Sequence, residues 1–191
     1  MSGGEIGKII RQILRDVKVE LSDEFDHNFE RQAFFSDKWK RSRRAERRGG
    51  ATLIDTSSLR KSIMSRSDAT SITFYTTEPY AAIHNEGGEI KVTAKMKRFF
   101  WAKYYETSGA FGRRKDGTLR RDKRNIRLTD EAEMWRCMAL MKVGSTIKIP
   151  KRQFLGASPE VEQTVREIIE ENLAEYVKQD VVNNIKKGIK R

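Results

Sequence analysis

Apolar residues recur at every third or fourth position near both ends of the chain. In residues 5–35 these positions are Ile6, Ile9, Ile10, Ile13, Leu14, Val17, Leu21, Phe25 and Phe29. In residues 158–185 they are Val161, Val165, Ile168, Ile169, Leu173, Tyr176, Val177 and Val181. This spacing is typical of amphipathic helices. It predicts an N-terminal helix about 45 Å long and a C-terminal helix that begins at Ser158 and Pro159, which suit the N-cap and the first helical position.

Shorter segments alternate between apolar and polar residues, as β-strands do. Residues 71–76 and 89–93 alternate in this way and flank the segment 79–88, which has a proline entry, a short apolar turn and a Gly-Gly exit. We expect the two strands to form a hairpin-like unit around this segment. Residues 145–149 predict a further strand that Pro150 ends. The predicted fold class is α+β: a small antiparallel sheet of about four strands, flanked by long N-terminal and C-terminal helices, with a long basic insertion loop.

The length of 191 residues suits one domain that spans residues 1–191. Its predicted parts are an N-terminal helix (5–35), a basic linker (36–50), a sheet core (51–105 and 145–157), an insertion loop with a short helix (106–144) and a C-terminal helix (158–185). The short helix is expected to be capped by Thr129 or Asp130. Asp55 or Thr56 is expected to cap one or two helical turns that reach Met64. The aromatic run 99–101 is expected to fill a core or a subunit seam beside the sheet.

The chain carries a formal net charge of +12, with 35% charged and 37% hydrophobic residues. Residues 38–48 and 113–127 each have a net charge of +6, so these two stretches hold the whole excess. Cations at such density can bind phosphates without sequence preference. Candidate contacts with DNA or a partner are Lys40, Arg41, Arg43, Arg44, Arg113, Arg114, Arg120 and Arg121. Trp39 could stack on a base, but the simpler interpretation of residues 38–48 is a solvated, partly mobile linker. Residues 106–128 are expected to be partly disordered until a partner binds.

The composition argues against several classes of protein. One cysteine, Cys137, leaves no intramolecular disulfide, and two histidines give no zinc-ligand spacing, so no metal or cofactor is expected. No apolar run approaches the length of a membrane span. His84, Glu86 and Asp55 could together perform acid–base chemistry. No nucleophile motif or phosphate-binding glycine loop accompanies them, so we expect no enzyme, with His84 hydrogen-bonded to backbone or to a neighbouring subunit.

Three short motifs occur in order along the chain. They fit the patterns L-x-D-T-G-x-L-x-x-S-I, Y-A-x-I-H-x-x-G and I-P-x-R-x-F-L-G. The matching residues are Leu53, Asp55, Thr56, Leu59, Ser62 and Ile63, then Tyr80, Ala81, Ile83, His84 and Gly87, then Ile149, Pro150, Arg152, Phe154, Leu155 and Gly156. With these motifs the chain resembles the phage virion morphogenesis family, the tail completion proteins of Mu-like and P2-like phages. The resemblance spans about residues 50–180, with an unmatched insertion of about 45 residues. Ser57 stands where the pattern has glycine, which leaves open whether the turn there uses a positive φ.

The resemblance implies a structural protein of the head–tail junction, a tail completion or tail terminator ring subunit needed for virion assembly. Its implied partners are further copies in a ring of about six subunits, other neck and tail tube proteins, and DNA that passes through the lumen. The resemblance further implies that the protein is located in the neck of the virion, that assembly takes place in the host cytoplasm, and that no membrane is involved. A nonspecific nucleic-acid-binding protein is the alternative function.

The residues expected to form the structural motif are Asp55, Thr56, Leu59, Tyr80, Ile83, His84, Gly87, Pro150, Arg152, Phe154, Leu155 and Gly156. Within this motif, Arg152 is expected to form an ion pair with Glu86 or Asp55. Such a pair would join the third motif to one of the other two.

Overall fold

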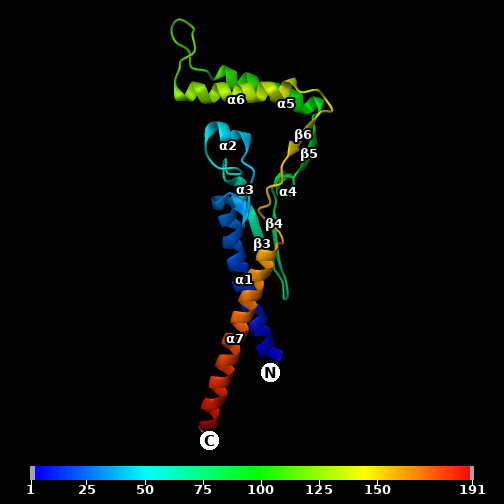
Figure 1. Cartoon of the computed structure of the whole chain (residues 1–191), viewed down its shortest axis with the longest axis vertical. Coiled ribbons are helices and arrows are strands. Elements are labelled where there is room, and N and C mark those ends of the chain that lie inside the picture. The colour runs from blue at the N-terminus through cyan, green and yellow to red at the C-terminus, as the bar shows by residue number, and fades with distance from the viewer. Residues whose placement is uncertain (1–2, 190–191) are drawn as a thin grey trace. The chain divides into compact units, whose positions relative to one another are not determined.

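The computed structural model describes residues 3–189 and has mixed α and β structure (Figure 1). In chain order its elements are α1 (Gly3–Arg31), β1 (Ala33–Phe34), β2 (Asp37–Lys38), α2 (Arg43–Arg48), α3 (Ser58–Lys61), β3 (Ile63–Ser67), β4 (Ile72–Thr76), α4 (Ala81–Glu86), β5 (Gly88–Lys91), α5 (Ala94–Gly109), α6 (Lys123–Leu140), β6 (Thr146–Ile149) and α7 (Pro159–Ile189). The strands of the described chain form three antiparallel pairs, β1–β2, β3–β4 and β5–β6. The α+β class and the two long terminal helices are thus confirmed, whereas one sheet of about four strands is not.

The chain divides into two compact units. Unit 1 comprises residues 1–86 and 151–191, of which 3–86 and 151–189 are described, and unit 2 comprises Gly87–Pro150. The chain therefore passes into unit 2 after Glu86 and returns to unit 1 at Lys151. A single domain over the whole length stays a prediction, and the two units are described separately below.

In unit 1, α1 and α7 pack together and run in opposite directions (Figure 1). From Ile13 onward the apolar stripe of α1 packs against the β3–β4 hairpin and the start of α7, in a cluster whose buried members are Val17, Leu21, Phe25 and Phe34. Ile6 and Ile10, nearer the N-terminus, are exposed. The ring of Phe25 meets that of Phe74 edge to face, with 5.0 Å between centroids. The spacing of the apolar residues thus predicts which face of α1 is covered.

Helix α1 ends at Arg31, four residues before the predicted end at residue 35. Gln32 and Phe35 adopt positive φ angles of 56° and 51°. Strand β1 lies between these two residues, and its partner β2 follows Phe35. The side chain of Asn28 accepts a hydrogen bond of 2.9 Å from the backbone N–H of Phe35, which fixes this turn. The apolar residues 34 and 35 continue the helical pattern in sequence, but they belong to the turn that ends the helix.

The predicted hairpin between residues 71–76 and 89–93 is wrong. Strand β4 pairs instead with β3, in a register that places Ile63 opposite Thr76, so residues 63 and 64 are strand and not helix. A tight turn joins the two strands, because Asp68 accepts hydrogen bonds from the backbone N–H groups of Thr70 (2.9 Å) and Ser71 (2.8 Å). Residues 88–91 pair with β6 in unit 2.

Unit 2 consists of the paired strands β5 and β6 and, between them in the sequence, a helical hairpin of α5 and α6. Residues 94–105, predicted to belong to the sheet core, are helical, and the side chain of Thr93 caps the helix by accepting from Met96 N–H at 3.2 Å. Helix α6 begins at Lys123, with Asp122 and not Thr129 or Asp130 as its N-cap. The loop predicted at residues 106–128 is therefore helical at its two ends, 106–109 and 123–128, and irregular over residues 110–122.

Candidate functional site: the junction of the three motifs

The second and third motifs are joined by backbone and amide hydrogen bonds within unit 1. The N–H of Arg152 donates to the carbonyl of His84 at 2.8 Å. The side chain of Asn85 accepts from the N–H groups of Phe154 (2.9 Å) and Leu155 (3.1 Å) and donates to the carbonyl of Leu155 (3.0 Å). Asn85 thus replaces the strand partner that this extended segment lacks. Sequence analysis missed Asn85, because it occupies a variable position of the motif pattern.

Phe154 anchors the third motif in the second core cluster of unit 1, where it is buried with Phe29, Leu59 and Ala81. Trp39 packs edge to face on Phe29, with 5.5 Å between centroids, and its indole N–H donates to the carbonyl of Gln153 at 2.6 Å. Trp39 is therefore part of this core. The interpretation of residues 38–48 as a linker is wrong for Trp39, which packs in the core, and for α2, which is a helix of unit 1. Most of the described side chains in this stretch are exposed.

The first motif contributes buried Leu59 and a strained turn. Ser57 has φ 61° and ψ 11°, in the left-handed region, and it precedes α3 without making a side-chain cap. Asp55 and Thr56 are not the N-cap that the sequence predicts. Asp55 forms an ion pair with Arg44, and the hydroxyl of Thr56 bonds to that of Ser58 at 2.7 Å.

Ser57→Gly is expected to raise the free energy of unfolding by about 1 kcal/mol, because glycine adopts a left-handed conformation without the steric cost that a side chain brings. Urea denaturation followed by circular dichroism measures the change. Ser67→Gly, in the extended strand β3, serves as the control and should lower the stability, because there glycine only adds flexibility to the unfolded chain. Equal effects of the two substitutions would contradict the left-handed assignment.

A cavity of about 370 Å³ lies where the first motif approaches the other two. Its lining residues are Ser42, Arg44, Thr52, Leu53, Asp55, Thr56, Ser57, Ser58, Leu59, Tyr80, His84 and Arg152. The structure thus brings together Asp55, Thr56, Leu59, Tyr80, His84 and Arg152 from the predicted motif residues. The other predicted motif residues do not line this cavity. Phe154 and Leu155 lie in the core, and Ile83 is half-buried. Gly156 has a positive φ of 123°, and Gly87 and Pro150 lie where the chain passes between the two units.

Arg152 is the buried charge of this cavity, with 6% of its surface exposed. Its Nε donates to the carbonyl of Lys40 at 2.8 Å. Among the described residues no ion pair includes Arg152, so the predicted pairing with Glu86 or Asp55 is wrong: Asp55 is held by Arg44. Burial without a counter-charge lowers the pKa of Arg152 from its ordinary value.

His84 lies beside Arg152 in the same cavity. Burial, and next the positive charge of Arg152, lower the pKa of His84, which favours the neutral imidazole. Its Nδ1 is buried and has no hydrogen-bond partner in the described structure. The ring of Tyr80 packs edge to face on it, with 6.2 Å between centroids. The acid–base trio of His84, Glu86 and Asp55 is not assembled, because among the described residues no hydrogen bond joins His84 to either carboxylate. The described part of the chain also contains no group of three or more side chains that could hold a metal ion.

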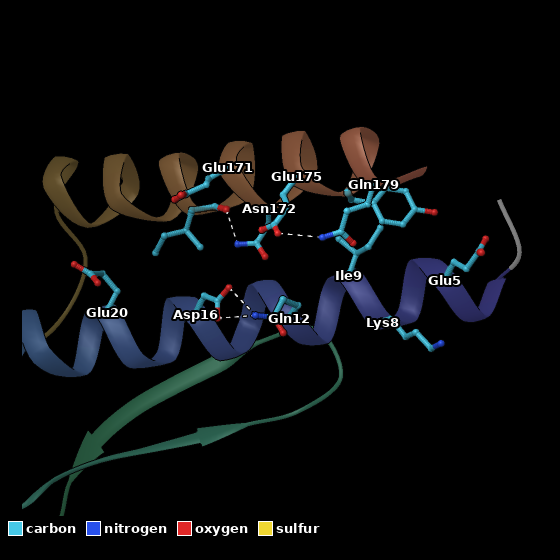
Figure 2. Close-up of a pocket in the computed structure, with 12 residues that line it drawn as sticks. Glu5, Lys8, Ile9, Gln12, Asp16, Glu20, Glu171, Asn172, Glu175 and Gln179 are labelled. Atoms are coloured by element: carbon cyan, nitrogen blue, oxygen red, sulfur yellow. Dashed lines mark hydrogen bonds between the residues drawn. The ribbon is translucent and has the colours of Figure 1, made fainter. Parts of the chain in front are cut away.

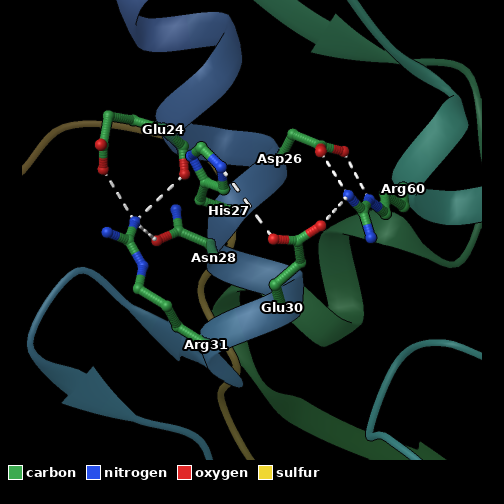
Figure 3. A network of polar contacts seen from close by, with 7 residues as sticks. All are labelled: Glu24, Asp26, His27, Asn28, Glu30, Arg31 and Arg60. Carbon is green, nitrogen blue, oxygen red and sulfur yellow. Dashed lines mark hydrogen bonds and ion pairs between the residues drawn. The ribbon is translucent and has the colours of Figure 1, made fainter.

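An ion-pair network attaches α3 to α1 on another side of unit 1 (Figure 3). Arg60 donates to both carboxylate oxygens of Asp26, with 2.5 Å from its Nε, and to Glu30 at 2.7 Å. The hydrogen bonds from Arg60 lower the pKa of Asp26 below its usual range. This fork was not predicted, because residues 34 positions apart in sequence give no local signal.

Arg60→Met is expected to lower the free energy of unfolding by about 1 kcal/mol at neutral pH, a modest value because the pair is partly exposed to solvent. Since the folded-state pKa of Asp26 is depressed, its contribution is present above the pKa of the unfolded state and is lost as the pH falls through the folded-state pKa. Urea titrations of the wild type and the variant at pH 7 and below about pH 3 should therefore converge at acid pH. A difference that persists unchanged in acid would contradict the assignment.

Helices α1 and α7 leave two grooves and an exposed apolar stripe. One groove, of about 680 Å³, is polar, with Asp16 and Glu20 on α1 and Glu171 and Glu175 on α7 (Figure 2). The other, of about 640 Å³, is lined mainly by apolar side chains of α1, α7 and the β3–β4 hairpin. The stripe lies on α7 at four-residue spacing and consists of Ile169, Leu173, Val177, Val181 and Ile185, each between 36% and 57% exposed.

The candidate contact residues of the two basic stretches differ in their environments. In unit 1, Arg41 and Arg44 donate to the backbone carbonyls of Ala45 (3.0 Å) and Ile54 (3.2 Å), whereas Lys40 and Arg43 are exposed. In unit 2 the candidate residues Arg113, Arg114, Arg120 and Arg121 are exposed and lie in the segment between α5 and α6. Buried Asn125 holds this segment by bonding to the N–H and carbonyl of Gly112 and the carbonyl of Arg120, so the segment has defined structure.

Comparison with known proteins agrees with the motifs. The model of the phage virion morphogenesis family matches residues 5–174, which cover most of unit 1 and all of unit 2. No curated protein and no solved structure matches the chain. Within residues 3–189, no helix is both long and apolar enough to cross a membrane. Because the family model covers most of the 191 residues, this chain belongs to the phage virion morphogenesis family.

Proposed function

We propose that this chain is a structural subunit of the head–tail junction of a phage or prophage, and that copies of it close into a tail completion or terminator ring. Membership of the family implies that this chain takes part in the assembly of the virion. The exposed stripe on α7 is the observation that carries the more specific proposal. Other neck and tail tube proteins would then bind the faces of the ring.

The α7 stripe is more than isolated apolar side chains on a surface. Its five residues follow one another at four-residue intervals, each about 40° further round the helix than the one before, so neighbouring members share a face and the stripe winds slowly around α7. Monomeric soluble proteins rarely expose contiguous apolar patches of such extent. Covering each of these side chains would contribute about 1 to 2 kcal/mol, which favours association with another chain.

A closed ring requires two different complementary surfaces on each subunit. Unit 1 offers such a pair. The α7 stripe from Leu173 to Ile185 is convex and apolar, and the groove between α1, α7 and the β3–β4 hairpin, which Ile169 borders, is concave and also mainly apolar. We infer that the stripe of one subunit packs into the groove of the next. An association of this kind joins two different surfaces and is therefore heterologous. The ring closes when the rotation from one subunit to the next is a whole-number fraction of a full turn.

The mass of the purified protein in solution tests this proposal. Light scattering after size exclusion should give a single species of about six chains, unchanged by nuclease treatment and by 1 M salt. Electron microscopy of the same fraction should show closed rings. A monomer under all conditions would contradict the ring.

Nucleic-acid binding is the second candidate, and the charge of unit 2 favours it. Residues 87–150 contain sixteen basic and seven acidic residues, so unit 2 holds +9 of the net charge of +12. On α5, the rings of Trp101 and exposed Tyr105 stack with 5.9 Å between centroids, which is a surface suited to bases. The two functions are compatible, since DNA passes through such a ring. An oligomer that disappears with nuclease or high salt would favour nucleic-acid binding as the primary role.

A further inference from the structure

We propose that the cavity around Arg152 and His84 is a binding site for a carboxylate group, supplied by an acidic side chain of another protein chain. That the other chain is a virion protein rests on the proposed function. The chemistry of the site does not rest on it, because it follows from the side chains that line the cavity.

Arg152 supplies the charge that such a site needs. It is more than nine-tenths buried, and within the described residues its guanidinium makes one hydrogen bond, from Nε to the carbonyl of Lys40. That bond fixes the plane of the guanidinium and leaves the two terminal nitrogens as donors. A buried cation without a partner is costly, and a planar carboxylate is the group that matches its fork geometry.

His84 adds a side chain at the same place that a bound anion would stabilise in its charged form. Its imidazole lines the cavity, and burial and then the positive charge of Arg152 lower its pKa. Its Nδ1 lacks a hydrogen-bond partner within the described chain, which is rare for a buried polar atom, but this nitrogen is out of reach of solvent and is not the donor to a ligand. A carboxylate beside Arg152 would favour the imidazolium, so both side chains favour an anion.

The rim of the cavity favours a carboxylate on a polypeptide over a phosphate of DNA. Asp55 lies at the rim with 75% of its side chain exposed, where it pairs with Arg44. Its negative charge repels a polyanion more strongly than a single carboxylate. A volume of about 370 Å³ also exceeds the need of one carboxylate group and leaves room for the side chain that bears it and part of a loop.

The test uses the full chain labelled with ¹³C at the Cε1 atoms of its two histidines, His84 and His27. His27 is exposed and lies on α1, so it serves as the internal reference. Sodium acetate should shift the His84 signal in a saturable way and raise its pKa, because a bound anion stabilises the imidazolium, while the His27 signal follows a sodium chloride control. Sodium phosphate and a single-stranded oligonucleotide are titrated in the same way.

Two variants make the result specific. Arg152→Lys keeps the charge but loses the fork, and it should weaken acetate binding by about tenfold or more. Arg136→Lys, at an exposed position of α6, should leave acetate binding unchanged. If Arg152→Lys does not fold, the wild-type titration decides alone.

The outcomes separate the possible ligands and the state of the site. A His84 pKa below the ordinary histidine value of about 6.5 identifies an empty site, and if acetate then changes neither the shift nor the pKa of His84, the proposal is wrong. Tighter binding of phosphate or the oligonucleotide than of acetate would also overturn it, in favour of a phosphate site. A His84 pKa already above about 6.5, and lowered by dilution that dissociates the oligomer, would show that a carboxylate of a neighbouring subunit fills the site. Acetate binding by a protein that forms no ring would support the site while contradicting the ring.

Discussion

The double variant Leu173→Glu, Val177→Glu is expected to fold normally and to lose the ring. Both side chains lie on the exposed α7 stripe, so the substitutions remove no buried contact within the chain. In the ring they would place two carboxylates in an apolar interface, where an unpaired charge costs several kcal/mol. We expect the association constant to fall by at least about a hundredfold, measured by light scattering, with an unchanged circular dichroism spectrum.

The same helix provides a control with equal spacing and equal change of charge. Ala174→Glu with Lys178→Gln also alters two exposed positions four residues apart and also changes the net charge by −2, but it leaves the stripe intact. This variant should assemble as the wild type does. If both double variants assemble, the α7 stripe is not the interface. If neither assembles, general repulsion and not the apolar stripe explains the loss.

Asn85→Ala is expected to lower the free energy of unfolding by about 3 kcal/mol. The substitution removes three hydrogen bonds at once and leaves two backbone N–H groups and one carbonyl of Phe154 and Leu155 without a partner. Each unsatisfied buried group costs about 1 kcal/mol or more. Urea denaturation measures the loss.

Asn172→Ala is the matched control, because the side chain of Asn172 makes one hydrogen bond, of 2.9 Å, to the carbonyl of Ile168 within its own helix. That carbonyl also belongs to the helical ladder, so we expect a change below about 0.5 kcal/mol. Asn85→Ala with a similarly small effect would mean that water or a backbone shift replaces the amide. The position would then be a packing site and no longer the link between the second and third motifs.

The parts of the fold that the sequence predicts well are those with local signals. Helix α7 begins at Pro159 as predicted, because the hydroxyl of Ser158 caps it by accepting from Val161 N–H at 3.2 Å. Alternation identified β4 and β6 as strands but carries no information about their partners, which is why the hairpin with residues 89–93 is wrong. Helix α5 was missed because its aromatic residues have high strand propensity. Packing against α6 stabilises the helical conformation instead.

The candidate site was predictable only as a set of motifs. The order of the three motifs in the sequence led to Leu59, His84 and Arg152, which the fold brings to one cavity. The partner of Arg152 could not be predicted, because the direction of a long side chain depends on neighbours such as Lys40, more than 100 residues away in sequence. Asn85 was missed for the same reason: its role is defined by Phe154 and Leu155 and not by residues next to it.

The pairing of β5 with β6 makes unit 2 a replaceable module. Gly88 lies opposite Ile149 in this ladder, so the points where the chain leaves and rejoins unit 1 are held about 5 Å apart. A segment whose two ends are this close can be lengthened, shortened or exchanged for a tight turn without moving the residues on either side. Unit 2 and its nine excess positive charges can therefore diverge independently of the α1–α7 framework. One assembly scaffold can in this way acquire different contacts from one phage to another.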